Sequence, residues 1–356
     1  MTAVRTAAVI GAGSQGAVHA FGLSHIPNLR IVAISDVDQV AATALAARHD
    51  AQAYTDVERL FAEQRVDLLS VCAPAAAHPV IVALALAHGV TAIHCEKPMA
   101  LTYGEARRLV ETAAAHGATL TINHQRRFDR MHRAVRERVA GGAIGELLGA
   151  QGYCANLFDW GSHTIDLLRL HLGDPTATSV LAQIDVAARK RVYGAPTETA
   201  GVATVRFDSG IDAVITTGRD EPLHPLGHNG IVIQGASGRV DVFGGRAVIH
   251  ADGELPVEIL ESVGEEFRIE LGGVDPAVIE QTALALADLV HSAETGAAPV
   301  LAARHGLAAA EIVFAAYESS VRRGLVRLPL DVFDNALQRG LDEGLWAPAT
   351  EIVSTY

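Results

Sequence analysis

Five short apolar runs alternate with helical patterns over the first 125 or so residues, and this alternation constrains the fold more than any other feature. The runs read TAAVIGAG, RIVAISD, DLLSVCAP, TAIHCE and ATLTINH. Each is continuously apolar, as strands are when helices cover both faces of a parallel sheet. The sequence therefore predicts an α/β domain with a doubly wound parallel sheet over residues 1–125.

The first run ends in VIGAGSQG, which gives Gly11, Gly13 and Gly16 the spacing G-x-G-x-x-G. These glycines permit a tight turn, close approach of a pyrophosphate, and close packing of helix on strand. The second run ends at Asp36, where a carboxylate accepts hydrogen bonds from ribose hydroxyls and repels a 2′-phosphate. Because no Arg or Lys follows in DVDQVAA, the pattern predicts a Rossmann domain that binds NAD rather than NADP. The alternative is turn glycines and a polar residue at a strand end.

After residue 150 the pattern changes to short β-type runs broken by turns such as DSG and ASG. The runs are TATSVLAQIDVAA, AGVATVRFDSGIDAVITTG, NGIVIQGASGRVDVFGGRAVIHA and FRIEL. They predict an α+β domain with a large open, mostly antiparallel sheet over residues 126–330, together with three helices. Residues 331–356 form a tail in which Leu337, Leu341 and Leu345 share one helix face. That face packs on this chain or on a partner subunit.

The charge and cysteine content narrow the class of protein. The net charge of −13 argues against nucleic acid or an anionic membrane as a partner. Three cysteines without a CxxC pair, no secretion-signal pattern and no membrane-spanning run predict a cytoplasmic protein with reduced thiols. No zinc-ligand spacing occurs apart from His224 and His228, whose loop contains Pro225 and Gly227, so we expect no metal.

The strand TAIHCE stops abruptly at Lys97, which is one of only two lysines among 28 basic residues. Arginine cannot release its proton in a protein, whereas a partly buried lysine can. A lysine kept in an arginine-rich chain is therefore a candidate for chemistry, although codon bias explains the arginine excess equally well.

A second candidate group lies in DWGSHTIDLLRL, which places Asp159, His163 and Asp166 at i, i+4 and i+7 on one helix face. Ser162 is a plausible N-cap, which would put His163 in the first turn. The helix dipole there disfavours the imidazolium and keeps the ring neutral, as a general base requires. Alternatively, Asp159 and Asp166 are exposed residues near the start of the helix, and His163 packs under the sheet without a catalytic role.

These motifs together resemble the Gfo/Idh/MocA oxidoreductases, the family of glucose–fructose oxidoreductase and inositol 2-dehydrogenase. The resemblance extends over nearly the whole chain, and the combination of E-K-P with a later D-x-G-x-H-x-x-D is its most specific part. Other matching segments are VIGAGSQG, SVCAPAAAHPVIVALALAHG, GAIGELLG and GAAPVLAARHGLAAAEIVFAAYESSVRRGLVRLP.

The resemblance implies a role for each matching residue. Lys97 would polarise the reacting hydroxyl and pass protons, and a cis bond to Pro98 would direct it out of the strand. His163 would be the acid/base, Asp159 would orient it or contact the sugar, and Asp166 would support the site or bind substrate. The cofactor contacts would come from Gly11, Gly13, Ser14, Gln15, Gly16, Asp36, Ala73, Pro74, His78 and Glu96.

The chain departs from the family pattern between GAIGELLG and DWGSH, where many members carry a longer insertion that walls the sugar pocket. The segment RDEPLHPLGHNG, or a partner subunit, could complete the site instead. In NHQRRF, Asn123 and Arg126 or Arg127 are candidate substrate contacts. A solvated loop that begins the next helix is an equally good reading.

Three hypotheses for function follow. The first is an NAD-dependent dehydrogenase, a homodimer or homotetramer, that acts on a secondary hydroxyl of a sugar, sugar derivative or cyclitol. The second is the same scaffold with tightly held NAD, which would perform epimerisation, oxidoreductase-type transfer or NAD-assisted glycoside cleavage. The third is a non-catalytic NAD sensor, which has no need for Lys97, Asp159 and His163 together.

Overall fold

The computed structural model describes residues 5–187, 190–218 and 229–346, and divides the chain into two compact units. The first unit comprises Met1–Ala100, Glu105–Phe128 and Val263–Arg304. The second comprises Leu101–Gly104, Asp129–Ser262 and His305–Tyr356. The sequence analysis expects a division near residue 125, whereas this division places residues 263–304 with the first unit.

The first unit is built on a six-stranded, wholly parallel sheet with the strand order β3-β2-β1-β4-β5-β6. Its central strands β1, β4 and β5 are buried almost throughout, which explains their continuous apolar sequences. The strands are β1 (Arg5–Ile10), β2 (Leu29–Ser35), β3 (Gln52–Tyr54), β4 (Leu68–Val71), β5 (Ala92–Cys95) and β6 (Thr119–Ile122).

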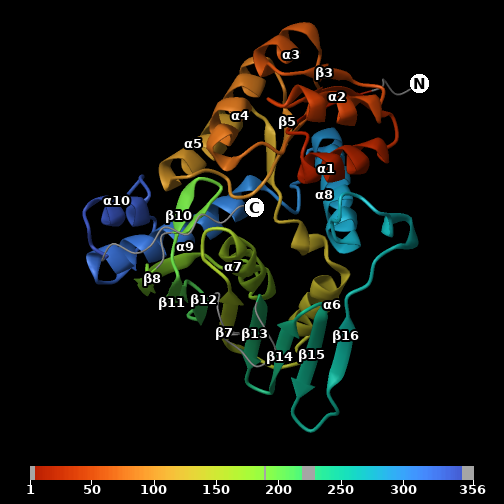
Figure 1. Cartoon of the computed structure of the whole chain (residues 1–356). Coiled ribbons are helices and arrows are strands. Elements are labelled where there is room, and N and C mark those ends of the chain that lie inside the picture. The colour runs from red at the N-terminus through yellow and green to blue at the C-terminus, as the bar shows by residue number, and fades with distance from the viewer. Residues whose placement is uncertain (1–4, 188–189, 219–228, 347–356) are drawn as a thin grey trace. The chain divides into compact units, whose positions relative to one another are not determined.

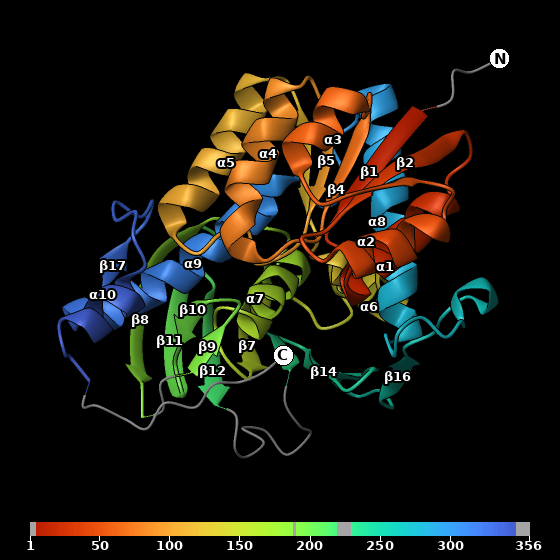
Figure 2. The same ribbon diagram turned by 45° about the horizontal axis from the view of Figure 1, so that its top comes forward.

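Helices cover both faces of this sheet, with α1, α2 and α8 on one face and α3, α4 and α5 on the other (Figure 2). Asp38 and Asp56 begin α2 and α3 by accepting hydrogen bonds from first-turn amides. The doubly wound fold predicted from the sequence is therefore confirmed. The helices are α1 (Ser14–Ser24), α2 (Gln39–Ala47), α3 (Val57–Glu63), α4 (His78–Ala87), α5 (Tyr103–Ala115), α8 (Pro276–Thr295) and the short η1 (Ala75–Ala77), η2 (Gln125–Phe128) and η3 (Glu265–Phe267).

Helix α8 belongs to the first unit because its apolar face completes that unit's core. A Cβ added at Gly22 of α1 would lie 3.0 Å from the Cα of Ala283, so the two helices are in close backbone contact. Leu286 and Leu289 are fully buried in the same cluster. The FRIEL segment just before α8 was predicted to be a strand, and this is wrong. Its apolar residues pack with Val18 of α1 and not in a sheet.

The second unit is built on a nine-stranded sheet with the order β16-β15-β14-β13-β7-β12-β11-β8-β17 (Figure 1). Only β7 and β12 pair in parallel among these strands of the described chain. The predicted mostly antiparallel sheet is confirmed. The strands are β7 (Leu147–Cys154), β8 (Ala177–Asp185), β11 (Ala200–Phe207), β12 (Asp212–Gly218), β13 (Gly230–Gly235), β14 (Gly238–Phe243), β15 (Arg246–Ala251), β16 (Val257–Leu260) and β17 (Val326–Arg327), with β9 (Lys190–Val192) and β10 (Ala195–Thr197) as a separate pair.

Four helices pack in the second unit: α6 (Arg130–Ala140), α7 (Trp160–His171), α9 (Ala303–Arg322, from His305 onward) and α10 (Ala336–Asp342). The tail helix α10 packs on its own unit, because Leu337 is fully buried in that unit's core and Leu341 packs against it. The helix ends at Asp342, so Leu345, which was predicted to share its face, lies beyond it and is 41% exposed. Helix α7 approaches β7 closely at Gly152. A Cβ there would lie 2.8 Å from Cγ2 of Thr164 and 2.9 Å from Cδ1 of Leu168.

Replacing Gly152 by Ala is expected to destabilise the second unit by about 1–3 kcal/mol, because the side chains of Thr164 and Leu168 must shift to make room. Differential scanning calorimetry should show a fall in Tm of several degrees. The matched control is Gly149→Ala on the same strand, where an added Cβ meets only ordinary contacts, its nearest neighbour being the carbonyl oxygen of Asp212 at 3.4 Å. Equal Tm values for the two variants would contradict the close packing of α7.

Candidate active site

The glycine motif forms the turn from β1 into α1. Gly11 has φ +101°, and a Cβ on Gly16 would lie 1.9 Å from the carbonyl oxygen of Gly11, so neither position admits a side chain. A Cβ on Gly13, by contrast, would meet no atom within 4 Å, which leaves open space beside the start of the helix. Ser14 and Gln15 begin α1, and no side chain caps its first-turn amides. This turn fits the pyrophosphate of a dinucleotide.

Asp36 follows β2 and faces the same turn. Its Oδ2 accepts a hydrogen bond from the amide of Ala12 at 2.6 Å, and its Oδ1 accepts one from Asp38 at 2.9 Å. The carboxylate therefore stabilises the glycine turn and retains lone pairs for a ribose diol. This arrangement fits NAD and disfavours the additional phosphate of NADP.

Ala73, Pro74 and His78 lie after β4 at the same carboxyl edge. Ala73 and Pro74 are accessible, whereas His78 is 1% exposed and its Nε2 donates to the carbonyl oxygen of Ala73 at 2.7 Å. Burial lowers the pKa of His78, so the ring is neutral. His78 therefore holds the turn that Ala73 and Pro74 form.

Glu96 and Lys97 end strand β5, and the bond between Lys97 and Pro98 is cis, as the resemblance implied. Glu96 is 8% exposed, and protein groups donate to both of its oxygens. Its Oε1 accepts from Nε2 of His19 at 3.0 Å and from Nδ2 of Asn123 at 2.8 Å. Its Oε2 accepts from the amide of Lys97 at 3.0 Å. The carboxylate is therefore held inside the unit.

The two candidates from NHQRRF lie in different environments. Asn123 is 1% exposed, and its amide nitrogen donates to Glu96. Arg126 lies in η2 and is partly exposed, while the neighbouring Arg127 is 3% exposed. Only Arg126 of this pair has a side chain with substantial access to solvent.

In the second unit, α7 carries Asp159, His163 and Asp166. The N-cap is Asp159 and not Ser162, so the cap predicted from the sequence is wrong. Ser162 lies within the first turn and donates to the carbonyl oxygen of Asp159 at 2.7 Å. His163 follows one position later, still beside the helix N-terminus, with 5% exposure, and Asp166 is 1% exposed.

The loop before α7 depends on a residue that the sequence analysis did not identify. Oε1 of Glu198 accepts from the amide of Leu157 at 2.6 Å, and Oε2 accepts from the hydroxyl of Tyr317 at 2.8 Å. Burial raises the pKa of Glu198, although both hydrogen bonds act in the opposite direction. Glu198, which lies between β10 and β11, thereby joins α9 to the loop before α7. A lone acidic residue in TETA carries no sequence signal for this role.

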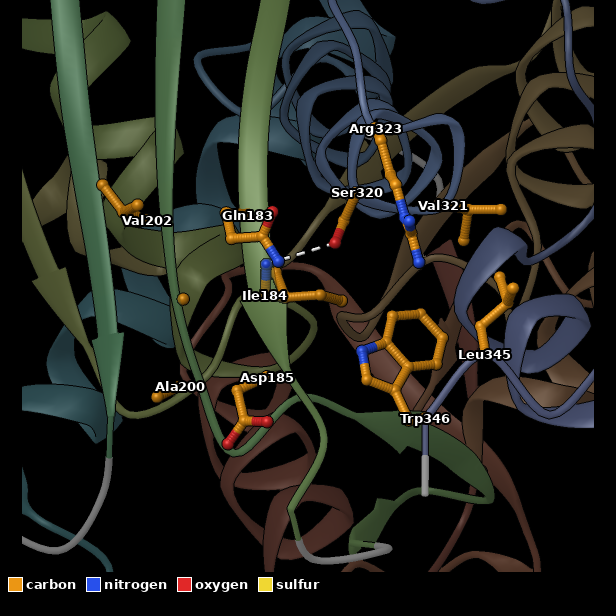
Figure 3. A pocket seen from close by; sticks show the side chains of 11 residues that line it. Gln183, Ile184, Asp185, Ala200, Val202, Ser320, Val321, Arg323, Leu345 and Trp346 are labelled. Atoms are coloured by element: carbon orange, nitrogen blue, oxygen red, sulfur yellow. Dashed lines mark hydrogen bonds between the residues drawn. The ribbon is translucent and has the colours of Figure 1, made fainter. Parts of the chain in front are cut away.

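The structure thus brings the predicted cofactor residues, Lys97 and Asn123 to one edge of the first sheet, and the three α7 residues to one helix of the second unit. A separate cavity of about 660 Å³ lies in the second unit and includes Asp185, Arg323 and Trp346, but none of the predicted site residues (Figure 3). The part of the chain that the structure describes contains no group of three potential metal ligands. None of its helices is long and apolar enough to cross a membrane. The His224 and His228 loop lies outside the described residues.

Comparisons with known proteins identify the class. Residues 5–124 match the oxidoreductase family with an NAD-binding Rossmann fold, and residues 155–241 match the GFO/IDH/MocA C-terminal domain. The protein is an NAD-binding oxidoreductase. The chain belongs to the Gfo/Idh/MocA family of oxidoreductases.

Individual relatives are distant. The uncharacterized oxidoreductase YrbE of Bacillus subtilis is 26% identical over 74% of this chain and 79% of its own. The myo-inositol 2-dehydrogenase of Thermotoga maritima is 27% identical over 72% of this chain and 78% of its own. An oxidoreductase from Agrobacterium radiobacter, solved with NAD⁺, L-tartaric acid and magnesium, has a TM-score of 0.78 at 19% identity and covers 91% of this chain and 98% of its own. That structure shows the shared fold.

Replacing Asp36 by Ala is expected to weaken NAD binding by about 10- to 100-fold, because the ribose hydroxyls lose a charged acceptor. Binding of NADP should improve, because the repulsion of its 2′-phosphate disappears. Calorimetric titration with both cofactors measures the ratio. The control is Asp38→Asn, which removes a neighbouring charge but keeps an oxygen for capping α2. An unchanged NAD-to-NADP ratio in Asp36→Ala would contradict the assignment.

Proposed function

We propose that this enzyme oxidises a secondary hydroxyl of a sugar, sugar derivative or cyclitol, with Lys97 and His163 in acid–base roles. The observation that carries the proposal is Lys97 itself, fixed at the carboxyl end of β5 on the edge where the glycine turn and Asp36 lie. Ligands of open α/β sheets bind outside the carboxyl ends of the strands. The named function of the inositol 2-dehydrogenase relatives supports the substrate class.

Bound NAD would accept the hydride. The residues of the chain supply the other groups that the reaction requires. A cationic Lys97 stabilises negative charge that develops on the substrate oxygen. His163, held at the N-terminus of α7, where the dipole favours the neutral ring, takes the hydroxyl proton at a ring nitrogen. Asp159 orients this histidine or contacts the substrate, and Asp166 and Arg126 bind substrate or support the site.

The remaining contacts of the proposed site concern the cofactor. We assign the backbone at Gly11 to Gly16 to the pyrophosphate, Asp36 to the adenosine ribose, and Ala73 and Pro74 to the groove wall. His78 supports that wall through its bond to Ala73. We place the enzyme in the cytoplasm, because Cys72, Cys95 and Cys154 are all free thiols.

Replacing Lys97 by Met is expected to lower kcat by about 10²- to 10⁴-fold while NAD affinity changes little, because the lysine acts on the reacting oxygen. His163→Asn should lower kcat similarly and remove one limb of the pH profile. The assay is NAD reduction on a panel of polyols, inositols and free sugars. The matched control is Lys190→Met, the only other lysine, which lies in β9. A joint loss of turnover and NAD affinity in Lys97→Met would mean that the lysine is structural.

The same preparation distinguishes the rival functions. Stoichiometric NAD in the denatured enzyme, with no net reduction of any substrate, would support an internal redox cycle such as epimerisation or glycoside cleavage. NAD binding without any turnover, and unaffected by either substitution, would support a sensor. Turnover with free NAD supports a conventional dehydrogenase.

We also propose that two copies pair through the face of the nine-stranded sheet that none of the described helices covers, as a dimer or as half of a tetramer. Leu181, Val202 and Val214 point to that face from three adjacent strands and are 37–50% exposed. The face also carries the ion pair between Arg206 and Asp212. A second copy would cover the apolar side chains.

Replacing Val202 by Arg is expected to halve the molar mass measured by size-exclusion chromatography with light scattering, because the guanidinium would be buried without a partner. The control is Val80→Arg, which alters an equally apolar, 71% exposed position on α4 of the first unit. A monomeric parent protein, or an unchanged mass in Val202→Arg, would refute pairing through this face.

A further inference from the structure

A buried carboxylate, Glu96, is the meeting point of three structural elements in the first unit. His19 comes from α1, one turn after Gly16 of the glycine motif. Asn123 comes from the end of β6, and the amide of Lys97 follows Glu96 directly. All three donate to the two oxygens of Glu96, at 3.0, 2.8 and 3.0 Å. The carboxylate therefore links the nucleotide-binding helix to the backbone of the lysine.

Each donor is itself fixed by further contacts. Nδ1 of His19 lies 2.6 Å from the hydroxyl of Ser70 on β4, and the histidine is fully buried. The backbone amide of Asn123 donates to the carbonyl oxygen of Cys95 at 2.8 Å. The amide of Glu96 donates to Val71 at 2.9 Å. The side chains thus have little freedom to reorient independently.

The charges of this cluster support a permanent ion pair. Burial acts against ionisation of both groups, yet the pKa of Glu96 falls to about 2, because His19 and Asn123 donate to it and Lys97 adds positive charge. The pKa of His19 rises to about 10, since burial is outweighed by Cys72 and by the Glu96 carboxylate. The other titratable groups around the pair are Cys72, His78, His94, Cys95 and Lys97. At neutral pH the imidazolium and carboxylate face each other.

A buried ion pair of this kind contributes little net stability, because the cost of desolvating two charges offsets their attraction. Hydrophobic residues of similar volume would stabilise the core equally well. The pair does, however, fix the orientation of Glu96, and Oε2 of Glu96 holds the amide from which Lys97 leaves the strand. Displacement of a catalytic group by about 1 Å can cost about 10²-fold in rate.

We propose that His19 and Asn123 are positioning residues for Lys97, acting through the carboxylate of Glu96. The proposal rests on the proposed role of Lys97 in catalysis. It assigns Glu96 an internal function in place of direct contact with the cofactor, and Asn123 a function in place of substrate binding. It also connects the helix that receives the cofactor phosphates to the lysine that meets the substrate.

The two-lysine composition allows a direct spectroscopic test. Reductive methylation with ¹³C formaldehyde keeps the positive charge and labels Lys97, Lys190 and the N-terminus of the full-length enzyme. Lys97→Arg and Lys190→Arg variants assign the signals. In His19→Leu we expect the Lys97 signal to change its chemical shift and titration midpoint, while the Lys190 signal stays unchanged. An unchanged Lys97 signal in this variant would overturn the proposal.

Kinetics supply a second, independent measurement. His19→Leu should lower kcat by about 10²-fold with little change in NAD affinity. The acid side of kcat/KM should show a second ionisation besides that of His163, because loss of the donor and its charge leaves burial to raise the pKa of Glu96. His19→Gln restores a donor without the charge, so it should recover most of kcat while this second ionisation remains. Asn123→Leu should resemble His19→Leu more weakly.

A stability control separates positioning from folding. Leu69→Ala creates a cavity on β4 beside Ser70, and Leu69 is fully buried. This variant should lose Tm but keep the Lys97 signal and the pH profile. If His19→Leu fails to fold, His19→Gln carries the test through the second ionisation on the acid side, and its absence there would refute the proposal.

The outcomes also separate this inference from the proposed function. Loss of turnover in Lys97→Met, with normal kinetics and a normal Lys97 signal in both His19 variants, would refute positioning and leave the function standing. Full turnover in Lys97→Met, with a displaced Lys97 signal in His19→Leu, would refute the catalytic role and leave the structural link standing.

Discussion

The first unit depends on the close backbone contact between the β1 turn and α1. Gly16 approaches the carbonyl of Gly11 so closely that no Cβ fits between them. This contact sets the height and direction of α1 over the sheet, and the unfilled space at Gly13 follows from it. It also places His19, three residues after Gly16, where its ring can reach Glu96 at the end of β5. One steric constraint therefore determines both the phosphate turn and the ion pair below it.

Each unit contains a buried carboxylate, and the pKa values of the two carboxylates are shifted in opposite directions. Glu96 has a cationic partner, and its pKa is lowered, whereas the donors to Glu198 among the described residues are neutral, and its pKa is raised. Burial favours the neutral form of an acid unless nearby charge compensates. Both residues nevertheless anchor the backbone next to a candidate catalytic residue. Glu96 holds the amide of Lys97, and Glu198 holds the loop that leads to α7.

The sequence predicted those structural features that depend on residues close to one another in the chain. The glycine spacing, Asp36 and the apolar strands located the cofactor turn, because each reflects backbone geometry or burial within a few residues. The sequence analysis did not identify His19 and Glu198, because their partners Glu96 and Tyr317 lie 77 and 119 residues away in the chain. No local sequence pattern predicts contacts over such separations. Ser162 was a reasonable cap by residue type, but the helix begins earlier at Asp159. FRIEL has strand-like alternation, yet it packs under a helix.

The position of α8 has a consequence for synthesis. Its residues complete the core of the first unit, but they follow the strands of the second unit in the chain. On a ribosome the cofactor-binding half would therefore remain without one wall of its core until the nine-stranded sheet had almost entirely emerged. A fragment that stops near residue 128 would expose the apolar side of α1 to water. The cofactor-binding unit therefore completes its core only after strands β7 to β16 of the second unit have been synthesised.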